Sequence, residues 1–406
     1  MKVKHVKERC TNCGICRDLV MCPLGSVRIS VQSDSCVWCG SCVIACPNNA
    51  LVMENSEDVE YKVFLNGKKI KASGTIKDAL IKAGIEISKF PIKNSEESEK
   101  FFIPCGCGAC CACMVEVDGK VTTACLTPLF DEMTINTQVE RDIPLREVSG
   151  FGVHSAGGVG TPHYLKSLGR PIEVAVFAHG CNLRCDQCQN YGVAFTASGN
   201  LLESIETAQI LIGLKQQHNL DRIAISGGEC TLNRKWLLDL INNIKIMDKN
   251  VNIHVDTNGT ILTPDYIDDL IQKGMTDVGI DLKSLDPSTF RNITGLEDEK
   301  LAKKYLETSW SAVEYINSNY KDEVFMGIGI PYNKELISSE EIINMGSKIF
   351  NINPEIQISI LDYRPEFRLK DIKRPLEYEM LELKSSLNDI GLKNVIVQTN
   401  DGYIGP

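Results

Sequence analysis

Eighteen cysteines, nearly all gathered into short runs, are the feature that most restricts how this chain can fold. Disulfide frameworks are typical of small secreted domains, whereas compact cysteine runs are typical of metal centres. The basic N-terminal segment MKVKHVKERC contains no apolar stretch of the kind that a signal peptide requires. We therefore expect free thiols that bind metal, in a reducing, anaerobic cytoplasm.

Two cysteine runs lie within residues 1–56. The second run has the bacterial ferredoxin spacing C-x2-C-x2-C-x3-C-P, and the first has five residues between its third and fourth cysteines. In two-cluster ferredoxins the last cysteine of each run binds the other cluster. This rule predicts two 4Fe-4S clusters, one bound by Cys10, Cys13, Cys16 and Cys46 and the other by Cys36, Cys39, Cys42 and Cys22. The segment resembles a dicluster ferredoxin, and the alternative is a pair of zinc knuckles.

Residues 57–149 have the pattern of a small β domain. Apolar runs flank the dipeptides Asn66-Gly67 and Asp118-Gly119, which predict two hairpins, and residues 75–83 suit a short helix. Between the hairpins the spacing C-x4-C-x2-C, with a distant fourth cysteine, is that of plant-type 2Fe-2S ferredoxins. The predicted ligands are Cys105, Cys110, Cys113 and Cys125. The segment resembles a β-grasp 2Fe-2S domain, in which Cys107 and Cys111 are small loop residues or take part in ligand exchange.

Residues 150–406 alternate short apolar runs with stretches of helical periodicity, a pattern that predicts a parallel sheet with crossover helices. The expected strands cover residues 172–178, 222–226, 251–256, 277–282, 324–330, 356–361 and 394–398. The glycine-rich segment 151–162 lacks the Lys-Ser or Lys-Thr ending of a phosphate-binding loop. We expect this segment to be a flexible lead-in that covers the active site.

Three cysteines follow the first of these strands at C-x3-C-x2-C spacing. Cys181, Cys185 and Cys188 can bind three irons of a 4Fe-4S cluster and leave the fourth iron open, as a catalytic metal site requires. The alternative is a three-cysteine zinc site. With GCNLRC and the later Gly227-Gly228-Glu229, this part of the chain resembles the radical S-adenosylmethionine superfamily. The resemblance implies a partial (β/α)6 barrel in which S-adenosylmethionine binds the open iron, and Gly227, Gly228 and Glu229 bind the ammonium of its methionyl moiety.

Two further motifs close later strands. Asp256-Thr257-Asn258-Gly259 and Asp281-Leu282-Lys283, with Thr294-Gly295 beyond them, resemble the glycyl-radical-enzyme activases, the branch of pyruvate formate-lyase activating enzyme. That resemblance implies S-adenosylmethionine contacts from Asp256, Thr257, Asn258, Asp281 and Lys283. It also implies a monovalent cation bound by Asp256, Thr257, Asp281 and the carbonyl of Gly279. Gln187 and Cys230 depart from the family pattern.

The fold class expected from these segments is multidomain, α+β and α/β: residues 1–56 a dicluster 4Fe-4S ferredoxin domain, 57–149 a 2Fe-2S domain and 150–406 the radical S-adenosylmethionine domain. A net charge of -10 argues against a broad nucleic-acid interface, and no run approaches the roughly 18 apolar residues of a membrane helix.

The resemblance implies reductive cleavage of S-adenosylmethionine to a 5'-deoxyadenosyl radical, which takes a hydrogen atom from a protein or peptide substrate. The three N-terminal clusters would relay electrons from a low-potential donor. Two alternatives stay open: a maturase or dehydrogenase whose auxiliary clusters accept substrate electrons, and an electron-transfer protein without radical chemistry.

Overall fold

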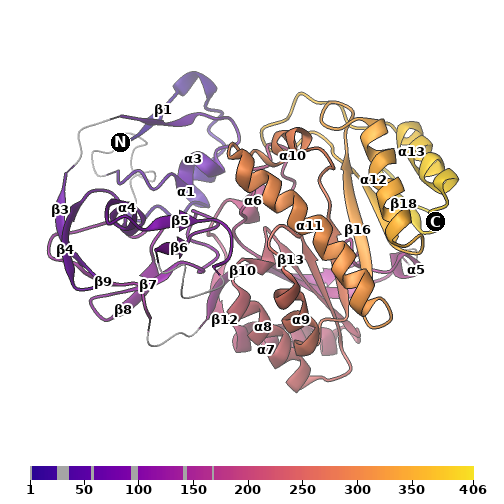
Figure 1. The fold of residues 1–406 in the computed structure, drawn as a ribbon, viewed down its shortest axis with the longest axis horizontal. Coiled ribbons are helices and arrows are strands. Elements are labelled where there is room, and N and C mark those ends of the chain that lie inside the picture. Colours follow the sequence, from indigo (N-terminus) through magenta and orange to yellow (C-terminus); the bar gives the residue numbers. More distant parts are fainter. Residues whose placement is uncertain (1, 25–35, 56–58, 93–98, 140–143, 167–168) are drawn as a thin grey trace. The chain divides into compact units, whose positions relative to one another are not determined.

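The computed structural model describes residues 2–24, 36–55, 59–92, 99–139, 144–166 and 169–406 (Figure 1). The chain forms two compact units. The first unit comprises Met1–Ser149, Ala178–Asn182 and Asn190–Glu203, and the second comprises Gly150–Phe177, Leu183–Gln189 and Ser204–Pro406. The predicted domain boundary at residues 56 and 57 lies outside the described residues, and the division into three domains stays a prediction.

The N-terminal part of the first unit contains a short structural repeat. Cys13-Gly14 precedes helix α1 (Ile15–Asp18) and Cys39-Gly40 precedes helix α3 (Ser41–Ala45). Both glycines have φ near +80°, and the residue before each cysteine also has a positive φ, 54° at Asn12 and 42° at Trp38. Backbone that alternates in this way turns successive N–H groups inward, a geometry common at iron-sulfur and anion sites. Strand β1 (Lys2–His5) pairs antiparallel with β2 (Leu51–Glu54) and closes this part.

A five-stranded sheet follows in the first unit, in the order β4-β3-β9-β7-β8. Its two hairpins turn at the predicted dipeptides, because Leu65 pairs with Lys68 and Val117 pairs with Lys120. Both turns place two consecutive residues at positive φ, which Asn-Gly and Asp-Gly tolerate well. The strands are β3 (Tyr61–Leu65), β4 (Lys68–Ala72), β7 (Met114–Val117), β8 (Lys120–Thr123) and β9 (Thr134–Asn136). Both predicted hairpins are confirmed.

The core of this sheet holds two of the predicted cluster ligands. Helix α4 (Ile76–Lys82) begins at Thr75, whose side chain and backbone N–H both bond the carboxylate of Asp78. The buried face of the helix packs with the sheet and with Cys113 and Cys125 in one apolar cluster. A short parallel pair, β5 (Glu86–Ser88) and β6 (Lys100–Phe102), completes the described part of this region.

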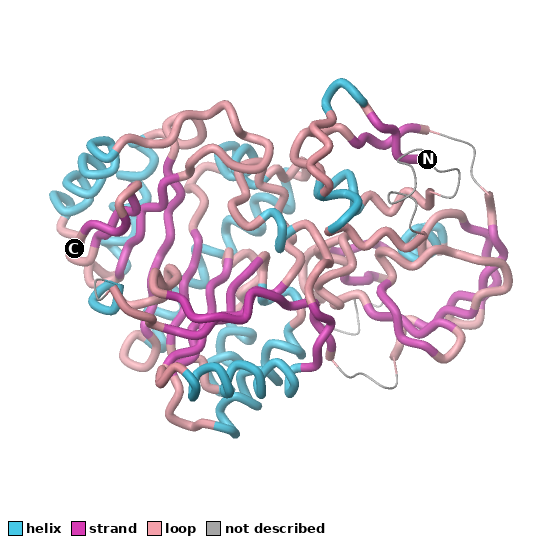
Figure 2. Tube along the Cα trace, turned by 180° about the vertical axis from the view of Figure 1, so that it is seen from behind, coloured by secondary structure: helices cyan, strands magenta, loops and turns pink. Residues whose placement is uncertain are grey.

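The second unit is built on a parallel sheet whose strand order follows the chain, β11-β13-β14-β15-β16-β17-β18, with β19 at its edge. Figure 2 shows strands of this unit, in magenta, running side by side near the C-terminus. The strands from β13 to β18 pair parallel, and β19 pairs antiparallel with β18. Their bounds are β11 (Glu173–Ala178), β13 (Arg222–Gly227), β14 (Asn252–Thr257), β15 (Asp277–Asp281), β16 (Phe325–Tyr332), β17 (Gln357–Asp362), β18 (Val395–Thr399) and β19 (Gly402–Ile404). All seven predicted strands are therefore present.

Helices cover one face of this sheet. Crossovers between neighbouring parallel strands are right-handed, so a sheet wound in chain order places its helices on the same side. The helices pack along that side in successive pairs, such as α7 with α8, α8 with α9 and α12 with α13. They are α7 (Ser204–Gln217), α8 (Arg234–Met247), α9 (Pro264–Lys273), α10 (Pro287–Thr294), α11 (Glu299–Tyr320), α12 (Ser339–Ile352) and α13 (Glu377–Ile390). Ile253, Val255, Val278, Ile280 and Ile328 alternate toward this side and are fully buried.

The opposite face of the same strands is polar or lacks side chains. In register across it lie His254 with Asp277, Asp256 with Gly279, and Asp281 with Gly329. Segment 157–161 packs against this face, since a Cβ added to Gly160 would lie 2.5 Å from the backbone nitrogen of Gly279. Glycines at 279 and 327 therefore make room for this segment.

Residues 151–162 were expected to be flexible, and this part of the expectation is wrong. Residues up to His154 belong to strand β10 (Leu145–His154), and the following turn is held in place. Gly160 donates its N–H to Asp256 and the side-chain amide of Gln357 donates to the carbonyls of Val159 and Thr161. The physical reason is that glycine-rich backbone can also fit tightly where no side chain is accommodated.

Within the described part of the chain, no helix combines the length and the apolar character that crossing a lipid bilayer requires.

Candidate active site of the second unit

The cysteine loop of the second unit is supported by two separate segments. Arg184 donates its N–H to the carbonyl of Thr294, and any side chain at Gly295 would collide with the carbonyl of Arg184. The carbonyl of Asp186 accepts N–H groups from Arg368 and Leu369. The Thr294-Gly295 motif therefore has a local function in the fold, because it holds the loop that carries two predicted cluster ligands.

Cys185 and Cys188 share one turn of this loop, with the N–H of Cys188 donated to the carbonyl of Cys185 at 3.1 Å. Cys185 is buried and Cys188 is partly exposed. Burial raises the pKa of the Cys185 thiol, and the nearby cation of Lys283 opposes this effect. Cys181, the third predicted ligand, is also buried and belongs to the first unit.

Gln187 lies in the same loop and is almost fully buried. Its side-chain amide donates to the carbonyl of Arg364 at 2.7 Å, while its Oε1 atom has no hydrogen-bond partner among the described residues. The guanidinium of Arg368 pairs with the carboxylate of Asp186 at 3.2 Å. This ion pair links the loop that follows β17 to the cysteine loop.

The motifs that end β13 and β14 meet at the carboxylate of Glu229. This side chain is buried and accepts four hydrogen bonds, two from Thr231, one from the hydroxyl of Thr257 and one from the N–H of Asn258. Burial raises the pKa of Glu229, and these donors oppose the rise. Gly227, at the end of β13, has a φ of 125° that favours glycine. The structure thus brings together Glu229, Thr257 and Asn258, three residues predicted to contact S-adenosylmethionine.

Cys230, next to Glu229, is fully buried, and its thiol donates to the carbonyl of Asp256 at 3.2 Å. This contact is that of a small buried side chain.

The Asp281-Lys283 pair connects the end of β15 with the cysteine loop. The ammonium of Lys283 lies 2.9 Å from the carboxylate of Asp281 and 3.2 Å from the hydroxyl of Tyr363. Burial lowers the pKa of Lys283, but the attraction of Asp281, Tyr363 and Cys185 outweighs it and raises that pKa well above its usual value. A buried cation therefore stands beside Cys185.

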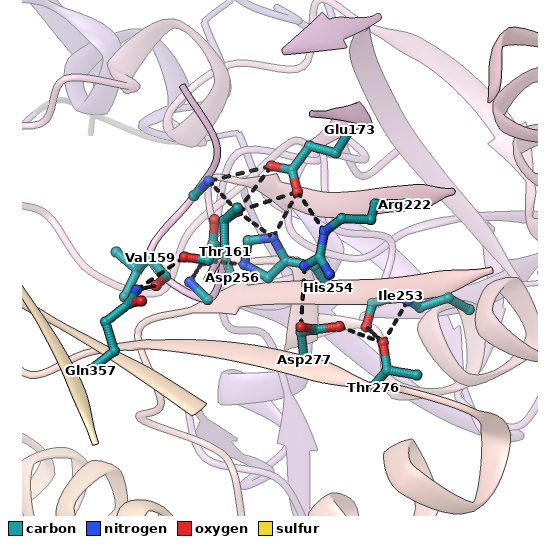
Figure 3. Close-up of polar contacts among 12 residues, drawn as sticks. Val159, Thr161, Glu173, Arg222, Ile253, His254, Asp256, Thr276, Asp277 and Gln357 are labelled. Atoms are coloured by element: carbon teal, nitrogen blue, oxygen red, sulfur yellow. Dashed lines mark hydrogen bonds and ion pairs between the residues drawn. The ribbon is translucent and has the colours of Figure 1, made fainter. Parts of the chain in front are cut away.

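A cluster of buried charges lies on the polar face of the sheet (Figure 3). His254 bonds Asp256 at 2.8 Å through Nε2 and Glu173 at 3.3 Å through Nδ1. Arg222 lies 3.8 Å from Glu173 and 3.2 Å from Asp277. Burial lowers the pKa of His254, but Asp256 and Glu173 outweigh this and raise it to about 10.

The charges of this cluster balance. Three acids, Glu173, Asp256 and Asp277, face the cations of Arg222, protonated His254 and Lys166, whose ammonium donates to the carbonyl of Gly158 at 2.6 Å. Buried charges are tolerated when they are paired and hydrogen-bonded.

Glu173, Arg222, His254 and Asp277 were not among the site residues predicted from the sequence. The available signal was a polar residue at the first position of three otherwise apolar strands, and a histidine two residues before Asp256 on the same face.

The oxygen ligands predicted for a monovalent cation have partners within the protein. Asp256 bonds His254, Thr257 bonds Glu229 and Asp281 bonds Lys283. Among the residues that the structure describes, no three His, Cys, Asp or Glu side chains are arranged to hold a single metal ion. The monovalent cation stays a prediction.

The cysteines of the 2Fe-2S segment gather in the core of the first unit. Cys105 lies next to Cys107, Cys110 and Cys125, and Cys125 lies next to Cys113 as well. All of them are at most 1% exposed, a degree of burial that suits thiolates shared by a metal cluster. Cys111 has a φ of 53° and its thiol lies near the carbonyls of Gly108 and Ala109. Burial raises the pKa of Cys111 to about 12.

Among the N-terminal cysteines that the structure describes, members of each predicted ferredoxin set lie near one another, and the two clusters stay a prediction. Burial raises the pKa of Cys16, and its charged neighbours are Cys46, Cys13 and Cys10. A small cavity is lined by the four cysteines of the other set, Cys22, Cys36, Cys39 and Cys42. Backbone N–H groups of Trp38 and Ala50 point at the sulfurs of Cys36 and Cys46, at 3.4 and 3.3 Å. These donor sets fit iron-sulfur clusters, whose potentials depend on such hydrogen bonds.

Comparison with known proteins agrees with two of the predicted segments. Residues 175–343 match the radical SAM superfamily. The chain contains a radical SAM domain. Residues 60–140 match the 2Fe-2S iron-sulfur cluster binding domain, so this second predicted domain is also present.

Curated relatives of the radical SAM domain include proteins named GTP 3',8-cyclases. The protein from Petrotoga mobilis is 26% identical over 54% of this chain and 64% of its own length. A probable GTP 3',8-cyclase from Methanococcus vannielii is 36% identical over 30% of this chain and 39% of its own length. The chain thus spans only part of these relatives.

Solved structures with a similar chain path include SuiB of Streptococcus suis bound to S-adenosylmethionine. It is 17% identical, with a TM-score of 0.42 over 54% of this chain and 48% of that one. HydG, a maturase of the [FeFe]-hydrogenase, is 14% identical, with a TM-score of 0.42 over 54% of this chain and 50% of that one.

Proposed function

We propose that this protein is a radical SAM enzyme that cleaves S-adenosylmethionine reductively and removes a hydrogen atom from a protein or peptide substrate. The observation that carries the proposal is the hydrogen-bond network of Glu229, Thr257 and Asn258, which unites the motifs that end β13 and β14. Asp281, at the end of β15, bonds Lys283, and the charge of Lys283 acts on Cys185. Polar groups gathered after neighbouring parallel strands are the usual location of a ligand site in α/β folds.

The cluster proposed for Cys181, Cys185 and Cys188 supplies, when bound and reduced, the electron that splits S-adenosylmethionine into methionine and a 5'-deoxyadenosyl radical. The chain's own residues position the substrate of that step. Glu229, held by four donors, presents a fixed carboxylate to the methionyl ammonium. Lys283 keeps its proton and places a positive charge beside Cys185.

In this proposal, the role of the neutral cluster of buried charges is to hold the fold together around the site. It holds segment 157–161 against the polar face of the sheet through Gly160, Thr161 and Gln357. Because segment 157–161 fills the space beside the polar face of the sheet, water is kept out there, and a reactive radical is protected from side reactions.

A purine nucleotide is the second candidate substrate, favoured by the curated relatives, which are named GTP 3',8-cyclases. The basic residues that follow β17 argue for the peptide instead. Of the three arginines in this segment, Arg368 pairs with Asp186 and Arg374 pairs with Asp362, so these two guanidinium groups already have carboxylate partners.

The experiment that tests the core proposal is anaerobic incubation of the reconstituted full chain with S-adenosylmethionine and dithionite. We expect 5'-deoxyadenosine from the wild type and none above background from Cys185→Ala. If the two proteins give equal amounts, the enzyme proposal fails and the electron-transfer alternative stands.

Adding GTP or a peptide library from the host to the same incubation separates the two substrate classes. We expect turnover of S-adenosylmethionine to rise with peptide and not with GTP. A product with two fewer hydrogens and net reduction of the auxiliary clusters would favour the dehydrogenase alternative.

A further inference from the structure

The 2Fe-2S cysteine segment touches the loop that leads to Cys181, and both lie in the first unit. A Cβ added to Gly180 would lie 3.1 Å from the Cβ of Cys105 and 3.3 Å from the backbone nitrogen of Cys110. Gly180 has a φ of +86°. A glycine at this position therefore lets the residue before Cys181 lie in contact with two predicted 2Fe-2S ligands.

Strand β10 holds the two segments together. The carbonyl of Ala109 accepts the N–H of Glu147, and the carbonyl of Glu147 accepts the N–H of His179. Arg146, which is fully buried, donates to the carbonyl of His179 at 2.8 Å, and its charge acts on Cys110 as well. Hydrogen bonds therefore hold the two segments in contact within the first unit, and the cation of Arg146 lies next to both of them.

The 2Fe-2S segment also lies near the second ferredoxin run. Lys77 of α4 donates its N–H to the carbonyl of Ala124, the residue before Cys125, and its charge acts on Cys39 of that run. Cys39 packs against the apolar cluster that contains Cys113 and Cys125. The indole of Trp38 lies so close to Gly74 that an added Cβ would be 2.8 Å from its Nε1 atom.

The two ferredoxin sets adjoin each other in turn, because Cys16 of one set and Cys42 of the other interact electrostatically. These contacts link the cysteine groups of the first unit in the order Cys16 set, Cys39 set, 2Fe-2S set and Cys181.

We infer that this order is an electron-transfer path in which the 2Fe-2S centre is the immediate electron donor to the cluster at Cys181. The inference rests on the proposed function. Electron transfer between centres slows steeply with distance, so a centre whose ligands contact the residue next to Cys181 outcompetes more distant ones. One electron leaves a low-potential protein donor of the ferredoxin class and enters at the ferredoxin sets. It then passes through the 2Fe-2S centre and reduces the cluster at Cys181 by one electron. No atom or proton is transferred.

Glycine at 180 and arginine at 146 are positioning residues in this path. The glycine sets the approach of the two segments, and the buried guanidinium favours the more negative, reduced state of the 2Fe-2S centre beside it.

The test compares the full-length wild type with Cys125→Ser, which loses a 2Fe-2S ligand, and with Cys13→Ser, the matched loss of a ligand in the outermost set. The first readout is pulsed electron paramagnetic resonance of the fully reduced proteins without S-adenosylmethionine, which the reduced enzyme would cleave. We expect the signal of the cluster at Cys181 to relax several-fold more slowly in Cys125→Ser, because its nearest magnetic neighbour is gone, and to be unchanged in Cys13→Ser. The reverse pattern would overturn the inference.

The second readout is the rate at which a reduced ferredoxin reduces the cluster at Cys181 in stopped-flow experiments. We expect at least a tenfold loss in Cys125→Ser, and an equal rate would contradict the path. Should Cys125→Ser not fold, the wild type alone decides: its Cys181-cluster signal broadens as the 2Fe-2S centre is reduced in a potential titration, and an unbroadened signal overturns the inference.

Failure of the path and failure of the enzyme proposal are distinguishable. Dithionite reaches the cluster at Cys181 without the relay, so 5'-deoxyadenosine from Cys125→Ser with dithionite reports on the enzyme proposal alone.

Discussion

The Nε2 atom of His254 lies 2.8 Å from Oδ1 of Asp256, two residues farther along the same strand. On its other side the imidazole meets Glu173 at 3.3 Å, so one ring stands between two carboxylates that are 83 residues apart in the chain. Both carboxylates have a lowered pKa: burial raises it, and the bonds to His254 outweigh that effect. A protonated His254 is therefore the cation on which this part of the second unit depends.

We expect His254→Gln to destabilise the protein by about 3–5 kcal/mol, because it leaves buried carboxylates without their shared cation. The measurement is thermal unfolding of the holoprotein under anaerobic conditions. His218→Gln, which changes an exposed histidine on the end of α7, is the matched control and should leave the melting temperature within a degree or two.

The same contact predicts a pH dependence. The pKa of His254 is raised from 6.5 to about 10 in the folded protein, so its contribution to stability is complete below pH 6.5 and is lost as the pH rises through about 10. The wild type should lose stability over that range more steeply than His254→Gln, measured as the melting temperature at several pH values. Parallel curves for the two proteins would contradict a protonated histidine. Lys166, whose pKa burial lowers to about 8, and Arg222 also face these carboxylates in both proteins, so the test is the difference between the two curves.

Gly160→Ala tests the packing of segment 157–161. The added Cβ would lie 2.5 Å from the nitrogen of Gly279 and from the carbonyl carbon of Val278, so backbone has to move, at a cost of about 1–3 kcal/mol. Gly213→Ala, in the exposed middle of α7 with no neighbour within 4 Å, is the matched control and should be neutral or stabilising. The measurement is again the melting temperature, and equal values for the two variants would show that the segment does not pack as described.

Glu229→Gln tests the proposed S-adenosylmethionine contact. The amide is neutral and places an N–H group among the donors of Thr231, Thr257 and Asn258. We expect the dissociation constant for S-adenosylmethionine to rise about 10- to 100-fold, from the loss of a charge-assisted hydrogen bond. Equilibrium dialysis of the reconstituted protein measures it without turnover. Glu206→Gln on α7 is the control, and an unchanged constant in Glu229→Gln would remove this residue from the binding site.

Lys283→Met tests the cation beside Cys185. Removing a positive charge disfavours the added electron, so the midpoint potential of the cluster at this loop should fall by tens of millivolts, on the scale of a single charge at protein-like dielectric. A redox titration followed by electron paramagnetic resonance checks it. Lys300→Met, which removes an exposed lysine from α11, should leave the potential unchanged.

Many features of the fold followed from local patterns. The seven strands of the second unit were predictable because each is a short run of β-branched and aliphatic residues between helical stretches. The hairpins at Asn66 and Asp118 were predictable because few dipeptides tolerate two consecutive residues at positive φ. The cysteine spacings predicted the 2Fe-2S and radical SAM domains, since a cluster needs its thiolates within a short loop.

The sequence by itself determined these local elements and the chemical groups at their ends. Only the tertiary structure decided that Gly160 packs on Gly279, that His254 balances Glu173 and Asp256, and that Gly180 touches Cys105. Except for the bond between His254 and Asp256, each of these contacts joins residues far apart in the chain. Their energies depend on burial and close approach, which arise only when the sheet has formed, so no spacing of residues along the chain could predict them.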